Sequence, residues 1–148
     1  MKEIVQFLKL KENAVLPKRA TPGAAGMDLY ACIEQPVTLC PQELVTIPTG
    51  IAMALPPSGF GAFLFARSGL GVKHGICLSN GVGVIDSDYR GEICVGLCNA
   101  GNTPYTIVPQ ERIAQMVILP VCCPVIEQVT CLDQTQRGVG GFGSTGKI

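Results

Sequence analysis

Glycine and proline divide this chain into short apolar runs. There are 18 Gly and 11 Pro in 148 residues, and the apolar runs between them are about four to eight residues long. Runs of this length are typical of β-strands, and no long stretch keeps the 3.6-residue period of an amphipathic helix. We therefore predict an all-β fold in which residues 1–132 form one domain and residues 133–148 form a flexible C-terminal arm.

The charged residues are balanced, with 11 Lys and Arg against 11 Asp and Glu, so the formal net charge is zero. Proteins that bind nucleic acid or an anionic membrane usually carry a basic excess, and we expect neither partner here. The apolar run near the N-terminus is too short for a signal peptide, and no run reaches membrane-spanning length. We expect a cytoplasmic protein that binds any anionic ligand through local groups.

The chain has eight cysteines and a single histidine, His74. The cysteines include no CxxC pair, and most lie in apolar runs, where a free thiol acts as a small buried hydrophobe. We expect reduced, structural thiols. A single histidine excludes a two-histidine zinc site. We expect a structural role for His74, so a carboxylate is the better candidate for a general base.

Residues 81–92 hold the densest group of reactive side chains. Two apolar runs, 82–85 and 93–97, flank a turn-rich segment with two carboxylates, a phenol and a guanidinium, a pattern that predicts a β-hairpin. Asp86, at the end of an apolar run, is the best candidate for activating a water. Asn80 offers the donor and the acceptor that a pyrimidine edge requires. Both residues also have a conformational explanation, because Asp and Asn favour turns and caps.

Two further segments combine strands with charged groups. Asp28 lies inside an otherwise apolar strand, where a half-buried carboxylate costs free energy unless it is paired; a salt-bridged or edge Asp is the structural alternative. Arg67 and Ser68 follow an apolar strand at 60–65 and precede a short helix predicted to end near His74. A guanidinium, a helix start and Ser68 as N-cap together favour a phosphate site, although this succession of residues is common.

The C-terminal part changes character twice. The stretch 110–120 alternates in period two and predicts a strand whose Arg112 pairs with a surface carboxylate, and 121–132 predicts a last strand. Between 137 and 146, five of ten residues are glycine, which is too many for a regular element. Such an arm is either a floppy end or becomes ordered on a ligand. Its Arg, Ser, Thr and backbone N–H groups suit a triphosphate.

Five segments resemble, in order, the five motifs of the trimeric dUTP pyrophosphatases (dUTPases): 25–30, 66–71, 81–92, 110–120 and 137–146. The resemblance implies a distorted jelly-roll (β-clip-like) fold with one short helix. It also implies a homotrimer whose shared active sites are completed by the arm of a neighbouring chain. The implied reaction is hydrolysis of dUTP to dUMP and pyrophosphate by in-line attack of water on the α-phosphorus, which keeps uracil out of DNA and supplies dUMP for dTMP synthesis.

The resemblance also implies a role for individual residues. Asp86 would be the catalytic base, and Asp28 would contact Mg²⁺ through water. The residues implied to bind phosphate are Arg67, Ser68, Gly69, Gln115, Arg137, Ser144 and Thr145. Those implied to bind uracil and deoxyribose are Asn80, Gly83, Val84, Ile85, Tyr89, Phe142 and Gly143, with the Tyr89 ring excluding a 2′-hydroxyl. Two positions depart from the family pattern: Ala66 stands where Pro is usual, which affects local rigidity, and Gln110 stands where Gly is typical, which affects a turn.

Two other functions remain open at this point. A dCTP deaminase would share the fold and the phosphate ligands, but the Gly-rich fifth motif with Phe142 argues against it; ammonia release from dCTP would identify it. A non-catalytic, nucleotide-binding regulatory trimer is the other alternative. Intact Asp28, Asp86, Arg67 and Arg137 argue against loss of activity, and turnover of a nucleotide would decide.

Overall fold

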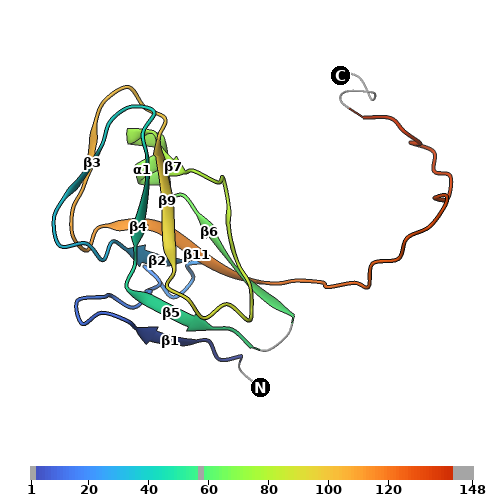
Figure 1. The fold of residues 1–148 in the computed structure, drawn as a ribbon, viewed down its shortest axis with the longest axis horizontal. Helices are drawn as coiled ribbons and strands as arrows, with labels where there is room; N and C mark the ends of the chain where they lie inside the picture. Colours follow the sequence, from blue (N-terminus) through green and yellow to red (C-terminus); the bar gives the residue numbers. More distant parts are fainter. Residues whose placement is uncertain (1–2, 57–58, 142–148) are drawn as a thin grey trace.

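The computed structural model describes residues 3–56 and 59–141. Within these ranges it contains eleven short strands and one short helix (Figure 1). The strands are β1 (Gln6–Lys9), β2 (Met27–Tyr30), β3 (Val37–Leu39), β4 (Leu44–Pro48), β5 (Ile51–Ala54), β6 (Phe60–Phe65), β7 (Ile76–Leu78), β8 (Gly83–Ile85), β9 (Cys94–Asn99), β10 (Tyr105–Ile107) and β11 (Arg112–Pro120). The helix, α1, spans Ser68–His74. The predicted all-β class with one short helix is therefore confirmed.

In the described part of the chain the strands form four antiparallel sheets. The largest has the order β2-β11-β6-β8, a second has the order β4-β9-β7, and β1-β5 and β10-β3 are two-stranded. Most paired strands are far apart in the sequence, so nearly every sheet joins distant segments. This non-local pairing is typical of a jelly roll, in which strands cross between sheets.

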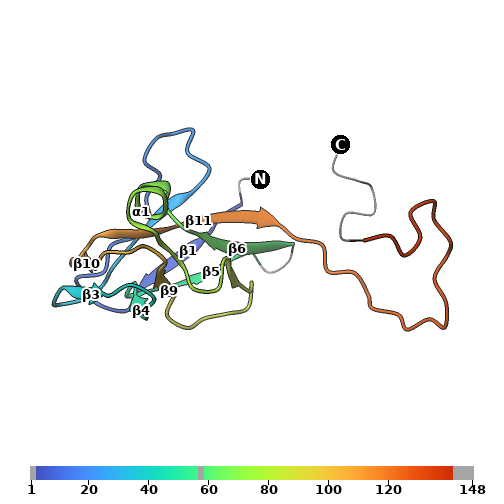
Figure 2. The same ribbon diagram turned by 90° about the horizontal axis from the view of Figure 1, so that it is seen from above.

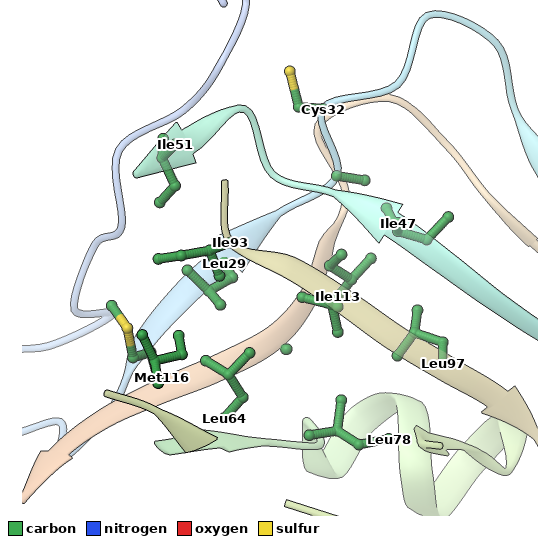
Figure 3. Packing of buried hydrophobic residues seen from close by; sticks show 14 of the residues in the cluster. Leu29, Cys32, Ile47, Ile51, Leu64, Leu78, Ile93, Leu97, Ile113 and Met116 are labelled. Atoms are coloured by element: carbon green, nitrogen blue, oxygen red, sulfur yellow. The ribbon is translucent and has the colours of Figure 1, made fainter. Parts of the chain in front are cut away.

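One hydrophobic cluster lies between these sheets and receives side chains from all four (Figure 3). Leu29, Ile47, Leu97, Ile113 and Met116 are each at most 1% exposed. Along β9 buried and less buried residues alternate, as expected for a strand with one face on the core. Because apolar burial is the main favourable term in folding, this cluster holds the sheets in one arrangement and so positions the ends of β2, β6 and β11.

The predicted hairpin at 81–92 is wrong. Strand β8 pairs with β6, with Ile85 opposite Ala62, whereas β9 pairs with β4 and β7. The physical reason lies at Ile93, which is 2% exposed and donates its backbone N–H to the carbonyl of Ile51 at 2.9 Å. Burial of Ile93 against β5 takes the chain away from β8 before β9 begins. Asp86 therefore leads into a wide loop between two sheets.

The predicted last strand at 121–132 is also wrong. Strand β11 ends at Pro120, and from there the chain leaves the body as an extended, irregular segment (Figures 1 and 2). Val125 and Ile126 are each 95% exposed. The apolar residues of this stretch are typical of a strand. Among residues 3–56 and 59–141, however, the stretch pairs with no strand. The division into a domain and an arm at residue 132 remains a prediction.

The cysteines are all free, as predicted, but their expected burial is mostly wrong. Only Cys32 is buried, while five are exposed: Cys40, Cys94, Cys122, Cys123 and Cys131. Three of these five lie in the irregular segment after β11, where the predicted strand is missing. In the residues that the structure describes, no helix has the length and apolar character needed to span a membrane.

Candidate active site

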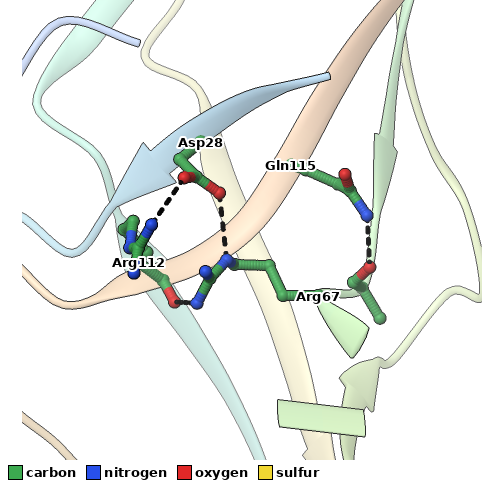
Figure 4. Close-up of polar contacts among 5 residues, drawn as sticks. Asp28, Arg67, Arg112 and Gln115 are labelled. Carbon is green, nitrogen blue, oxygen red and sulfur yellow. Dashed lines mark hydrogen bonds and ion pairs between the residues drawn. The ribbon is translucent and has the colours of Figure 1, made fainter. Parts of the chain in front are cut away.

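A carboxylate bound by two guanidinium groups lies where β2, β11 and the end of β6 meet. Asp28 Oδ1 accepts a hydrogen bond from Arg67 Nε at 3.0 Å, and its Oδ2 accepts one from Arg112 Nη1 at 3.1 Å (Figure 4). Arg67 Nη1 also donates to the backbone carbonyl of Arg112 at 3.1 Å. We call these three residues the Asp28 cluster. Arg112 pairs with a carboxylate as predicted, but the partner is Asp28, whose side chain is only 13% exposed, and not a surface carboxylate.

Strand pairing brings this cluster together. Asp28 lies opposite Gln115 in the β2-β11 pair, and Gln115 lies opposite Phe65 in the β11-β6 pair. Gln115 Nε2 donates to the carbonyl of Ala66 at 3.0 Å and so fixes the backbone just before Arg67. Ala66 stands where proline is usual in the family that this chain resembles, and this hydrogen bond from β11 restrains its backbone.

The start of α1 differs from the prediction in one detail. Arg67, with φ −85° and ψ 134°, occupies the N-cap position, and no side chain caps the helix. Its carbonyl accepts the first helical hydrogen bonds, from the N–H groups of Leu70 and Gly71. Ser68 is thus the first helical residue, so the prediction of Ser68 as N-cap is wrong. Ser68 and Gly69 are exposed, directly after Arg67.

Two cavities that share the lining residues Val84, Ile85 and Cys94 lie beside β8, and we call them the β8 cavities. One, of about 120 Å³, is lined by Asn80, Gly83, Val84 and Ile85 together with Leu64, Leu78, Cys94, Val95 and Gly96. The other, of about 280 Å³, is lined by Val84, Ile85, Asp86, Tyr89, Glu92, Ile93 and Cys94. The structure therefore brings together six of the predicted residues, and Asp86 lies at the wall of the larger cavity. Cys94 lines both cavities, although no motif in the sequence singled it out.

Local packing holds Tyr89 beside this larger cavity. Its hydroxyl donates to the backbone carbonyl of Glu92 at 3.1 Å. A Cβ at Gly91 would lie 2.6 Å from Tyr89 Cζ, so only glycine lets the ring lie this close to the backbone. Tyr89 is nevertheless 46% exposed, which leaves it available to a ligand.

The Asp28 cluster and the β8 cavities lie at different places on one sheet. Strands β2 and β8 are its two edges, three strand spacings apart, or about 14 Å. Along β6, Ile85 pairs with Ala62, whereas Arg67 follows the far end of the strand at Phe65. Asp86 therefore lies level with the start of β6, about 20 Å of extended chain from Arg67. A single chain does not bring the Asp86 carboxylate and the Arg67 guanidinium together.

The remaining predicted residues belong to the arm. Arg137 is exposed in the segment that leaves the body, where its Nε donates to the carbonyl of Gly140 at 2.9 Å. The segment after β11, to which Arg137 belongs, runs away from the body that contains β2 and β6 (Figure 1). The predicted contacts of Phe142, Gly143, Ser144 and Thr145 lie outside the described residues.

Tyr105, Glu111 and His74 form a second group of interacting side chains. The Tyr105 hydroxyl donates to Glu111 Oε1, and the His74 ring centroid lies 4.9 Å from that of Tyr105. Burial, followed by the hydrogen bond to Glu111, raises the pKa of Tyr105 to about 12. His74 thus packs on Tyr105, which agrees with its expected structural role. Tyr105 and Glu111 had no distinguishing signal in the sequence.

The next feature is the set of side chains that could contact a metal ion. No group of three or more His, Cys, Asp or Glu side chains that could hold a metal ion occurs in the described ranges. Mg²⁺ needs few protein ligands when substrate phosphates and waters complete its shell. Asp28 gives one lone pair of each oxygen to a guanidinium and keeps others for hydrogen bonds from water. The residues therefore fit a hydrated ion carried by phosphates.

Comparison with known proteins identifies the family of this chain. A model of the dUTPase family matches residues 12–146. A deoxyuridine 5'-triphosphate nucleotidohydrolase of Desulfitobacterium hafniense is 53% identical over 142 residues, which cover 96% of this chain and 94% of the relative. A protein of the same name from Ralstonia nicotianae is 47% identical over 147 residues, 99% of each chain.

Solved structures give the same result. The dUTPase of Staphylococcus bacteriophage 80alpha with bound dUpNHpp is 29% identical, with a TM-score of 0.87 over 97% of this chain and 98% of that one. A mutant dUTPase of Staphylococcus aureus phage phi11, whose structure reveals the coordination of a structural Mg(II) ion, is 27% identical. Its TM-score is 0.77 over 86% of this chain and 97% of that one. By family match, sequence identity and fold, this chain belongs to the dUTPase family.

Proposed function

We propose that this chain hydrolyses dUTP to dUMP and pyrophosphate, with Asp86 as the general base. The observation that carries the proposal is the pair of cavities beside β8: Asn80 lines one, Asp86 lines the other, and the two share lining residues of β8. The smaller cavity offers an amide and backbone groups for a pyrimidine edge. The larger one offers a ring for the sugar and a carboxylate for the water.

Asp86 activates the attacking water. It takes the proton as the water attacks the α-phosphorus in line, and the bond from that phosphorus to the bridging oxygen of the leaving pyrophosphate breaks. A general base of this kind contributes about 10²–10⁴-fold to a rate. Histidine is unsuited to the role, because the only one packs on Tyr105.

The phosphates are bound by donors that this chain holds ready. Arg67 supplies a fork of N–H groups, and Ser68 and Gly69 are exposed beside it. Gln115, Arg137, Ser144 and Thr145 supply further donors, the last three from the arm. Mg²⁺ bound to the triphosphate would neutralise part of its negative charge, and Asp28 would hold the hydrated ion through water.

Base and sugar selectivity arise from exclusion as well as attraction. Asn80 and the backbone of Gly83, Val84 and Ile85 bind the uracil edge in a space of about 120 Å³. Tyr89 packs on deoxyribose and leaves no room for a 2′-hydroxyl. Phe142 and Gly143 cover the base from the arm. A tight pocket rejects a larger ligand by steric clash, which is how thymine and ribose are excluded.

The working enzyme is a homotrimer with shared sites. Support comes from the separation within one chain: Asp86 is level with the start of β6 and Arg67 follows its end. A triphosphate bound by Arg67 therefore receives Asp86 from another copy. Exposed Val84 on the edge strand β8, and exposed Val125 and Ile126 after β11, are apolar surfaces that such an assembly would bury.

The test is pyrophosphate release from dUTP, dTTP, dCTP and UTP measured side by side with excess Mg²⁺, with the nucleoside product followed as well. Release from dUTP, with dTTP and UTP turned over at least about 100-fold more slowly, is the expected result. Deamination of dCTP, or no turnover of any of the four nucleotides, would overturn the proposal.

A further inference from the structure

The Asp28 carboxylate pairs with two guanidinium groups of its own chain. Its side chain is only 13% exposed, and both of its oxygens accept hydrogen bonds from guanidinium groups. The side chain of Arg67 is 24% exposed and that of Arg112 is 48% exposed, so both side chains reach solvent. The carboxylate therefore has a structural role toward Arg67 and Arg112 in addition to any contact with a hydrated metal ion.

The bonds to Arg67 fix the plane of its guanidinium group. Nε is held by Asp28 on β2, and Nη1 is held by the Arg112 carbonyl on β11. A guanidinium has five N–H donors in a rigid fork, so these two bonds leave three for a ligand. Two fixed points from two strands determine both the position and the tilt of the group.

The same carboxylate holds two like charges side by side. Arg67 and Arg112 each donate to a different oxygen of Asp28, at 3.0 and 3.1 Å. Two guanidinium groups this close repel each other unless an anion lies between them. With one carboxylate between two cations, the Asp28 cluster keeps a net positive charge, which still attracts phosphate.

We propose that Asp28 is a positioning residue, which orients Arg67 for the phosphates of the nucleotide by direct hydrogen bonding and independently of any metal ion. The inference rests on the proposed function, because it assumes that Arg67 binds phosphate. Asp28 acts through Arg67. Because Asp28 already orders the Arg67 side chain, binding of the nucleotide costs less side-chain conformational entropy.

The experiment measures the affinity of dUpNHpp for the full-length protein by calorimetry, with EDTA and no divalent cation. Asp28→Asn keeps the shape of the side chain but removes its charge. We expect this variant to bind dUpNHpp about tenfold or more weakly without metal, because Arg67 loses its fixed orientation. Glu34→Gln is the matched control, since it removes one negative charge at an exposed position, and its affinity should equal that of the wild type.

Two results would overturn the inference. Unchanged metal-free affinity, with weaker binding only when Mg²⁺ is added, would restrict Asp28 to the metal's water shell. Tighter metal-free binding would mean that Asp28 is a counter-ion that competes with phosphate. If the wild-type protein itself fails to bind dUpNHpp with Mg²⁺ present, the proposed function fails instead, so the two failures are distinguishable.

A second comparison tests whether Asp28 acts through Arg67. In an Arg67→Lys background the fork is absent, so Asp28→Asn should change metal-free affinity by less than about threefold. An equal loss in both backgrounds would contradict the proposal. Asp28→Glu serves if the asparagine variant does not fold: it keeps the charge but moves the carboxylate by one methylene, and it should also weaken metal-free binding. Full affinity of Asp28→Glu would show that charge alone suffices.

Discussion

The Asp28 cluster and the β8 cavities differ in how far their groups are paired within one chain. The cluster lies where three segments of the largest sheet meet, and its groups satisfy one another within one chain. Strand β8 is an edge of that sheet, pairs only with β6 in the described part of the chain, and exposes Val84 to 63%. An internal network keeps its geometry alone, whereas an edge strand is a surface for further pairing or packing. The region proposed to bind phosphate is therefore formed within one chain, whereas the region proposed to bind the nucleoside lies at a sheet edge that is open to a second copy.

The largest effect should come from the carboxylate at the β8 cavities. Asp86→Asn removes the proposed base, and we expect turnover of dUTP to fall by at least about 100-fold with little change in nucleotide affinity. Single-turnover measurements of pyrophosphate release check this. Asp88→Asn, which removes a carboxylate two residues further along the same loop, is the control and should keep most of the activity. Near-normal turnover by Asp86→Asn would remove it from the role.

Mixing two inactive variants tests whether the two regions meet between chains. If one chain supplies Asp86 and another supplies Arg67, co-refolding Asp86→Asn with Arg67→Ala at equal amounts should restore about a quarter of the sites by random assembly. Each variant refolded alone should stay inactive. The measurement is dUTP turnover per chain. No recovery in the mixture would place both residues of a site on one chain.

Removal of the Tyr89 ring should reduce the discrimination between dUTP and UTP. Tyr89→Ala opens the space beside the sugar, and we expect the ratio of kcat/KM for dUTP over UTP to fall about 10-fold to 100-fold. Tyr89→Phe keeps the ring and loses only the hydrogen bond to Glu92, so it should keep most of the discrimination. If both variants behave alike, the hydroxyl rather than the ring is the selective group.

Alkaline pH should lower the stability of the folded chain through the Tyr105 hydroxyl. Burial and Glu111 raise the pKa of Tyr105 to about 12 in the folded chain, against about 10 in the unfolded chain. Between these values the folded chain keeps a proton that the unfolded chain loses, so stability is full below about pH 10 and is lost as pH rises toward 12. Urea unfolding across this range should show a steeper fall for the wild type than for Tyr105→Phe. Parallel curves would rule out Tyr105 as the cause.

The smallest expected effect concerns the turn that precedes β11. Gln110 has φ +62°, a left-handed backbone conformation that glycine adopts without strain, and glycine is what the family pattern has there. Gln110→Gly should raise the free energy of unfolding by about 1 kcal/mol and leave nucleotide affinity unchanged. Chemical denaturation gives the first quantity and calorimetry the second. A destabilised variant would mean that the Gln110 side chain contributes more than its backbone costs.

Several features could be predicted from the sequence because they depend on neighbouring residues. The helix after Arg67 ends at His74 as predicted, because Gly75 adopts φ +71° and allows a left-handed cap. Asp28 lies in a strand, as its apolar neighbours indicated. The strand predicted at 121–132 is wrong because apolar residues indicate burial but do not indicate which strand would pair with them.

What the sequence alone determined is the all-β class, the approximate places of most strands and the chemical identity of the site residues, since glycine, proline and apolar spacing act over a few residues. Only the tertiary structure decided that β8 and β9 belong to different sheets and that Asp28 binds two arginines. Asp28 and Arg112 are 84 residues apart in the sequence. The period of a strand shows which side chains share a face, but the partner of the strand depends on how distant apolar segments bury one another in a common core.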